Sequence, residues 1–138
     1  MKILVAHDGS EQSNKALKKA VEFALKTDSS LTIFSVVPDL CMIEISEYDC
    51  TKIYETMTEE SNERVRVLKE ELLNKGLKVD TDVQFGNAAE MIVKTCNDKK
   101  IDMVVVGSHG RHGIKKFLLG SVSSKVVEHA PCDVMVVK

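Results

Sequence analysis

Met103-Val-Val-Val-Gly107-Ser-His-Gly110 is the most informative stretch of this chain, together with Gly120-Ser121 further along. Three consecutive valines are typical of a central strand that is buried on both faces of a parallel sheet. Glycines at the end of such a strand, and Gly-Ser where a helix starts, make a place at which backbone N–H groups can meet a phosphate. The stretch therefore predicts a strand, a glycine-rich loop and a helix that begins near Ser121.

Short apolar runs alternate with helical patterns on both sides of this stretch. The expected strands are Lys2 to Ala6, Leu31 to Val37, Lys78 to Phe85, Asp102 to Val106 and Val134 to Val137. The expected helices follow Ser10 as N-cap, then run from about Thr51 to Asn74, Asn87 to Asp98 and Ser121 to His129, and a polar, irregular segment is expected from about Asp39 to Cys50. Parallel strands need long crossover connections, which these helices supply. The chain is therefore predicted to be one α/β domain, residues 1–138, with helices on both faces of the sheet.

Composition limits the classes of partner. The chain has 138 residues, of which 43% are hydrophobic and 29% are charged, as in a soluble globular domain. The formal net charge is −2 and basic residues are scattered among acidic ones, which argues against nucleic acid or an anionic membrane surface. No apolar run approaches the ~20 residues that cross a bilayer, and the N-terminus lacks the apolar core of a signal peptide. We therefore expect a cytoplasmic protein without a nucleic-acid or membrane partner.

The cysteines and histidines raise the question of disulfides and metal. The four cysteines are Cys41, Cys50, Cys96 and Cys132. They show no CxxC spacing and no density of a disulfide scaffold, which predicts reduced thiols. His109-x2-His112 and His129-x2-Cys132 come close to the spacing of a zinc site. The predicted last helix carries His129 away from His109, so zinc is the weaker alternative and no metal site is predicted.

Polar and glycine residues follow the first and fourth predicted strands. In open parallel sheets, ligands bind beyond the carboxyl ends of the strands, where the winding direction reverses. Asp8 follows the first strand and Gly107 to Gly110 follow the fourth. These two strands are neighbours if the chain winds outward from the first strand and then returns. Asp8 and Gly107 would then form the floor of one cleft.

Each residue around this cleft can be given a role in binding a nucleotide. Gly120, Ser121 and Val122 would present free N–H groups at a helix N-terminus, and the hydroxyls of Ser121 and Ser123 would add donors for a phosphate. Asp8 could accept hydrogen bonds from a ribose or a base, and Val36 could wall an apolar pocket. The same residues also suit the turns and caps of an ordinary α/β fold. The residues alone leave both interpretations open.

The spacing Gly107-x2-Gly110-x9-Gly120-Ser121 resembles the ATP-binding signature of the universal stress protein family. The flanking Val-Val-Val-Gly-Ser-His-Gly-Arg, Leu-Leu-Gly-Ser-Val and His-Ala-Pro-Cys, and the opening Ile-Leu-Val-Ala-His-Asp-Gly-Ser, also resemble that family. The resemblance implies a Rossmann-like, open five-stranded parallel sheet of order 3-2-1-4-5 and a homodimer joined through the last strand, Val134 to Val137. It implies ATP, with Mg²⁺ held mainly by the phosphates, at Asp8, Val36, Val106, Gly107, Gly110, Gly120, Ser121, Val122 and Ser123.

The expected function is that of an ATP-binding universal stress protein in stress response or signalling. The nucleotide would be a regulatory ligand with slow or no hydrolysis, because no general base is evident beside the phosphate loop. A weak ATPase and a nucleotide-independent dimeric interaction module remain as alternatives, the second because Val134 to Val137 is a short apolar edge. A nucleotidylyltransferase is disfavoured because His109-Gly-Arg-His112 has the wrong order and follows the wrong strand, and no GxxxxGK(S/T) phosphate loop is present.

Overall fold

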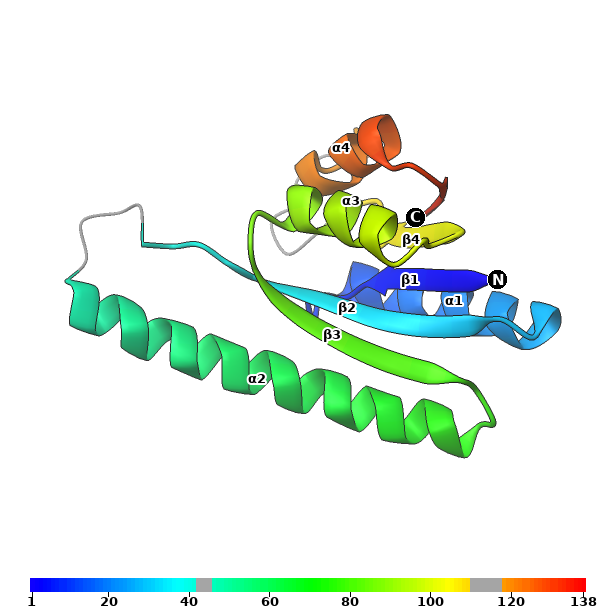
Figure 1. Ribbon diagram of the computed structural model, residues 1–138, viewed down its shortest axis with the longest axis horizontal. Coiled ribbons are helices and arrows are strands. Elements are labelled where there is room, and N and C mark those ends of the chain that lie inside the picture. Colours follow the sequence, from blue (N-terminus) through cyan, green and yellow to red (C-terminus); the bar gives the residue numbers. More distant parts are fainter. Residues whose placement is uncertain (42–45, 110–117) are drawn as a thin grey trace.

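The computed structural model describes residues 1–41, 46–109 and 118–138. Its parallel sheet has the strand order β3-β2-β1-β4-β5, as the family resemblance implied (Figure 1). The strands are β1 (Lys2–Ala6), β2 (Ser30–Pro38), β3 (Val79–Gly86), β4 (Met103–Gly107) and β5 (Asp133–Val137). The helices are α1 (Glu11–Thr27), α2 (Glu47–Asn74), α3 (Ala88–Asp98) and α4 (Ser121–His129).

Alternate side chains of the central strands enter two separate apolar clusters, one on each face of the sheet. Ile3 and Val5 of β1 lie in the cluster formed with α1 and α2, whereas Leu4 lies in the cluster formed with α3 and α4. In β4, Val105 joins the first cluster, and Val104 and Val106 join the second. Figure 1 shows α1 behind β1 and α3 in front of the sheet. The run of three valines is thus buried on both faces, which confirms the prediction of a central strand.

The helices begin where polar side chains satisfy their first N–H groups. The Ser10 hydroxyl accepts a hydrogen bond from the Ser13 N–H, which confirms Ser10 as the predicted N-cap, and the Asn87 side chain, at the predicted start of its helix, accepts one from the Glu90 N–H. Helix α2 begins at Glu47 rather than near Thr51 because Ser46 caps it and accepts from the Asp49 N–H. The irregular segment predicted from Asp39 to Cys50 is therefore wrong over its last residues, and 42–45 lie outside the described residues.

Helix α2 is 28 residues long, and its first turns run beyond the rest of the sheet beside the end of β2 (Figure 1). Most of its side chains are exposed and polar, and only Cys50, Ser61, Val65 and Leu72 are buried. Across the described ranges, the structure contains no helix with the length and apolar character that a membrane span needs.

A disulfide joins Cys41, which follows β2, to Cys50 in the first turns of α2, with their Cα atoms 5.8 Å apart. The prediction that all four cysteines are reduced thiols is therefore wrong. The CxxC spacing on which the prediction relied could not reveal this pair, because the two cysteines are nine residues apart. They come together only where α2 returns alongside β2. Cys96 and Cys132 are free thiols, as predicted.

Candidate functional site

The carboxyl edge of the sheet between β1 and β4 is the candidate site. The strand order places β2 and β3 on one side of β1 and places β4 and β5 on the other, so the winding reverses between β1 and β4. These strands pair in parallel, with Val5 opposite Val105. The chain therefore leaves β1 near Asp8 and leaves β4 at Gly107 on the same edge, as predicted, and such a switch point is where ligands bind in open α/β sheets.

Asp8 forms the turn that leads from β1 into α1. Its carboxylate oxygen Oδ1 accepts a hydrogen bond of 2.9 Å from the Ser10 N–H, while Gly9 adopts a positive φ of 83°. Ser10 then caps α1. The half-buried Asp8 thus has a local role in starting the helix, a role that aspartate commonly plays in turns, and its contact with a ligand stays a prediction.

Gly107 lacks a side chain because helix α1 passes too close to it. A Cβ atom at this position would lie 3.1 Å from the backbone carbon, the carbonyl oxygen and the Cβ of Gln12. The sequence pattern pointed instead to a ligand that approaches the backbone of this glycine. The structure supplies a packing reason for Gly107 and brings the first turn of α1 against the end of β4.

Hydrogen bonds close the loop between β4 and α4 at its base. The Ser108 carbonyl accepts from the Gly120 N–H at 2.7 Å and from the buried Ser123 hydroxyl at 3.0 Å. The Ser108 N–H in turn donates to the carbonyl of Val137 in β5. The expectation of a free Gly120 N–H is therefore wrong, and the Ser123 hydroxyl serves this closure. The predicted site residue Gly110 lies outside the described residues.

The N-terminus of α4 differs from those of α1, α2 and α3. Each of those three helices has a side-chain cap and at least one acidic residue in its first turn. Helix α4 has Gly120 as its N-cap, without a side-chain cap, and no acidic residue in its first turn. Within the described residues, no acceptor meets the N–H groups of Ser121, Val122 and Ser123. The partial positive charge of this helix end is thus uncompensated there, which favours an anion.

Val36 and Val106 contribute apolar surface beside this edge, in different ways. Val106 is 2% exposed and belongs to the cluster with α3 and α4, so its side chain contacts protein. Val36 is half-buried at the border of the same cluster and pairs with Gln84 of β3. Of the two predicted residues, Val36 is thus the one whose side chain can wall a pocket.

A buried polar cluster behind this edge was missed by the sequence analysis. The His7 ring, 3% exposed, bonds through Nε2 to Asn14 Oδ1 at 2.7 Å, and Arg64 of α2 donates to the Ser35 hydroxyl at 2.8 Å. Burial, aided by the nearby Arg64 guanidinium, lowers the pKa of His7, against the opposing effect of the Asn14 hydrogen bond. The ring is therefore neutral at physiological pH. The signal was the alternation Ile3, Val5, His7, which places His7 on the face under α1 and α2.

Two of the residues that suggested zinc have other surroundings in the structure. His129 is exposed beside Glu128, and Cys132 packs at the border of the cluster that contains Cys96. Within residues 1–41, 46–109 and 118–138, no group of three or more His, Cys, Asp or Glu side chains could hold a metal ion. His112 lies outside these ranges.

Known proteins resemble this chain over its whole length. The profile of the Universal stress protein family matches residues 1–138. A Staphylococcus epidermidis protein assigned to the universal stress proteins is 37% identical over 138 residues, covering 99% of this chain and 82% of the relative. A Staphylococcus saprophyticus relative is 34% identical with the same coverage.

Solved structures share the fold. Universal stress protein UspA from Lactobacillus plantarum has a TM-score of 0.90 at 24% identity, covering 100% of this chain and 97% of its own. A hypothetical protein whose biochemical function was assigned from its structure has a TM-score of 0.88 at 32% identity, with coverage of 99% and 94%. Two neighbours at TM-score 0.68 are a universal stress protein in complex with cAMP, at 23% identity, and an Arabidopsis thaliana family member with AMP bound, at 20% identity. The first covers 100% of this chain and 97% of its own, and the second 100% and 91%.

Proposed function

Because the chain belongs to the universal stress protein family, we propose that it is a nucleotide-binding member that takes ATP at the carboxyl edge between β1 and β4. The observation that carries this proposal is the N-terminus of α4, which lacks the side-chain cap and the acidic first turn of α1, α2 and α3. A phosphate is the anion that such a helix end binds best, because N–H groups and the helix dipole both face it.

An adenine nucleotide is the ligand class that agrees with the other residues at this edge and with the ligands named for two solved relatives. Two solved relatives hold cAMP and AMP. In this chain, the half-buried Val36 offers an apolar wall for a base, and Asp8 lies where β1 ends on the same edge. ATP would place its phosphates at Ser121 and Val122, with Mg²⁺ held mainly by the phosphates themselves. The nucleotide would act as a regulatory ligand, with slow or no hydrolysis.

A homodimer through β5 completes the proposal. β5 is an edge strand of the sheet, and Val134, Met135 and Val136 are half-buried in the isolated chain. An unpaired apolar edge favours pairing with another chain. Light scattering after size-exclusion chromatography tests this: we expect the mass of two chains, and Val136→Lys should give a monomer. A wild-type protein that elutes as a monomer at micromolar concentration would exclude this arrangement.

The test of the nucleotide site removes a single N–H donor. Ser121 is the first residue of α4, and Gly120 before it has φ −63° and ψ 164°, the extended conformation that a following proline requires. Ser121→Pro should therefore keep the helix while deleting one backbone donor, since proline is well tolerated at a first helical position. Ser121→Ala keeps that N–H and loses only the exposed hydroxyl.

Calorimetric titration with MgATP should then separate the variants. We expect Ser121→Pro to bind about tenfold more weakly than wild type, in line with the loss of one hydrogen bond to a charged group, and Ser121→Ala to bind within about threefold, as loss of a weaker neutral contact implies. Ala88→Pro, at the first position of the capped helix α3, controls for a general effect of proline. Absence of ATP binding by the wild type, or equal affinity of Ser121→Pro, would refute the proposed site.

The proposal also places the protein in the cytoplasm, where ATP and other adenine nucleotides are abundant. Separation of cell fractions, followed by detection of the protein with an antibody, tests the location. Recovery of the protein outside the cell would contradict it.

A further inference from the structure

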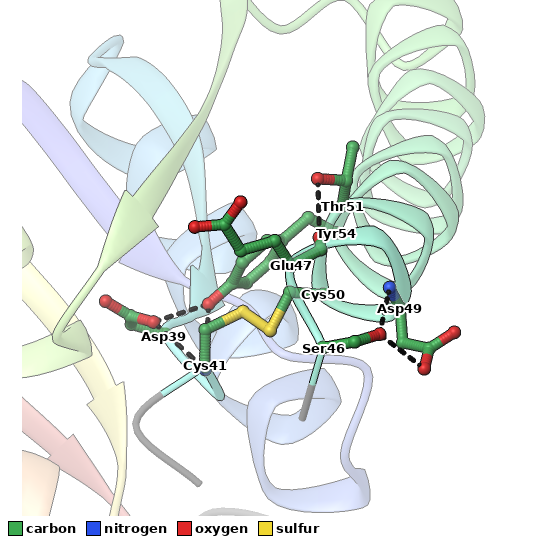
Figure 2. Close-up of a disulfide and its surroundings, with 8 residues drawn as sticks. All are labelled: Asp39, Cys41, Ser46, Glu47, Asp49, Cys50, Thr51 and Tyr54. Carbon is green, nitrogen blue, oxygen red and sulfur yellow. Dashed lines mark hydrogen bonds between the residues drawn. A yellow bond between two sulfur atoms is a disulfide. The ribbon is translucent and has the colours of Figure 1, made fainter. Parts of the chain in front are cut away.

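The Cys41–Cys50 disulfide fastens the end of β2 to the first turns of α2 (Figure 2). We propose that these two cysteines form a thiol–disulfide exchange site, whose oxidised state holds the start of α2 in place and whose reduced state releases it. The site comprises Cys41, Cys50 and the hydrogen-bonded pair Asp39 and Tyr54, which we call the β2–α2 clip.

The disulfide lies outside both apolar clusters of the described residues. Cys41 is half-buried and Cys50 is 8% exposed, so Cys41 is the more accessible of the two residues to a reagent in solution. The clusters that hold the sheet to its helices contain neither residue. Reduction should therefore leave the core of the domain intact, unlike the loss of a disulfide that crosses a core.

Tyr54 of α2 makes the noncovalent contacts that still join α2 to the end of β2 when the disulfide is reduced. Its hydroxyl donates to the Asp39 carboxylate and accepts from the Cys41 N–H at 3.1 Å. Its ring meets the ring of Phe85 in β3 edge to face, with 4.6 Å between centroids. In Figure 2 the Tyr54 side chain reaches from α2 to Asp39 beside the disulfide. Each of these contacts can break and re-form, whereas the disulfide is covalent, so the disulfide is the strongest single restraint between the end of β2 and the start of α2.

The exchange balances with a dithiol as reductant. One thiolate of the dithiol attacks Cys41 Sγ and forms a mixed disulfide, while Cys50 leaves as a thiolate and takes up a proton. The second thiol of the reductant then attacks the mixed disulfide and releases Cys41 as a thiol. The dithiol loses two electrons and two protons, and the clip gains them. A disulfide oxidant reverses both steps.

The other two cysteines supply an internal comparison. Cys96 is 1% exposed, and burial raises its pKa to about 12, with further effects from the adjacent Cys132. Burial also raises the pKa of Cys132. Both thiols stay protonated at neutral pH and should react slowly, because the thiolate is the reactive form. Exchange should therefore be confined to Cys41 and Cys50.

The clip also lies close to the proposed nucleotide edge. Asp39 and Cys41 continue the strand that carries Val36, and Val37 pairs with Phe85, the ring partner of Tyr54. An ordered end of β2 should raise the affinity for ATP, because this segment then loses less conformational entropy when the nucleotide binds. This part of the inference rests on the proposed function, and we expect reduction to weaken ATP binding by about threefold, the cost of ordering about one side chain.

The experiment measures thiol alkylation, backbone hydrogen exchange and ATP affinity on the same preparation of the whole chain. Oxidised protein is treated with millimolar dithiothreitol, alkylated with iodoacetamide and mapped by mass spectrometry, while circular dichroism monitors the fold. We expect alkylation of Cys41 and Cys50 but not of Cys96 and Cys132, with an unchanged spectrum. Hydrogen exchange should accelerate at residues 39–41 and 46–54 alone.

The double variant Cys41→Ser with Cys50→Ser serves as the control. It should exchange like the reduced wild type and should not respond to dithiothreitol. The exchange site would be overturned by reduction that occurs only when the protein unfolds, by equal alkylation of Cys96, or by identical hydrogen exchange of both redox states. ATP affinity that is equal in both states would remove only the link to the nucleotide. A failure of both states to bind ATP would refute the proposed function while the thiol and exchange data still decide the clip.

Discussion

Gly107 gives the sharpest test of how this fold constrains its candidate site. An alanine there adds a Cβ atom 3.1 Å from three atoms of Gln12, two of which belong to the backbone of α1. Ordinary contacts of a Cβ are longer, so α1 or the end of β4 must shift by a few tenths of an ångström. Helix α1 cannot shift freely, because Ala16 and Ala20 are fully buried against the sheet.

The magnitude follows from two opposing effects of Gly107→Ala. Overpacking of a well-packed core costs about 1–3 kcal/mol. The lower conformational entropy of alanine in the unfolded chain offsets about 0.4–1 kcal/mol. The midpoints of these two ranges, about 2 and about 0.7 kcal/mol, give an expected net loss of about 1.3 kcal/mol in the free energy of unfolding. Urea unfolding followed by circular dichroism measures it through the shift of the midpoint at constant m-value.

Gly76 provides the matched comparison, because it is required for a different reason. It has φ +84° and no atom within 4 Å of an added Cβ, so its replacement costs backbone strain without a steric clash. Asparagine adopts this conformation more easily than alanine, so Gly76→Asn should be more stable than Gly76→Ala. At Gly107 the order should reverse, since the larger side chain meets Gln12. A loss below about 0.5 kcal/mol for Gly107→Ala, the range of a neutral surface change, would refute this reasoning.

Three further predictions concern single side chains. Ser123→Ala should lower the free energy of unfolding by about 1 kcal/mol, because the Ser123 hydroxyl donates to the Ser108 carbonyl. The ATP affinity measured by calorimetry should stay unchanged, and a tenfold weaker affinity would contradict this. The lowered pKa of His7 means that, as the pH falls below the usual pKa of 6.5, the unfolded chain takes up a proton that the folded protein does not. Stability contributed by the neutral ring is therefore fully present above pH 6.5 and declines below it, by at most about 1.4 kcal/mol per pH unit. Urea unfolding at pH 5.5 and 7.5 measures this decline in the free energy of unfolding, and His7→Gln should make that free energy depend less on pH. Tyr54→Phe keeps the ring contact with Phe85 but loses the hydroxyl hydrogen bonds, so hydrogen exchange should accelerate at residues 39–41; unchanged exchange there would show that the hydroxyl does not order this end.

The elements with strong local signals could be predicted closely. β1 runs over Lys2–Ala6 and α4 over Ser121–His129, with the bounds expected from the apolar run and from the Gly-Ser start. Ser10 and Asn87 were recognisable as caps because a polar residue precedes a helical pattern in each case. The start of α2 escaped prediction because its first turns carry few apolar residues, so that the period of the helix is weak there.

The location of the candidate site in the sheet could be predicted from the sequence, but the hydrogen-bond partners of its residues could not. Strand ends and glycines indicate an edge, and the strand order brings Asp8 and Gly107 to the same edge. The partners of Gly120 N–H and of the Ser123 hydroxyl could not be inferred, since both bond to Ser108 across a loop. A residue type shows that a donor exists, whereas its acceptor depends on where the chain returns.

The amino-acid pattern was sufficient for properties that depend on neighbours along the chain: strand and helix periods, helix caps, and the glycine spacing typical of the family. Properties that depend on residues distant in the chain appeared only with the folded structure. Gly107 packs on Gln12, Cys41 pairs with Cys50, and the amino end of α4 lies beside Ser108 at the end of β4, with no side-chain cap among the described residues. The physical reason is range: a hydrogen bond, a disulfide or a steric contact acts over a few ångströms, and only tertiary packing brings such atoms within that distance.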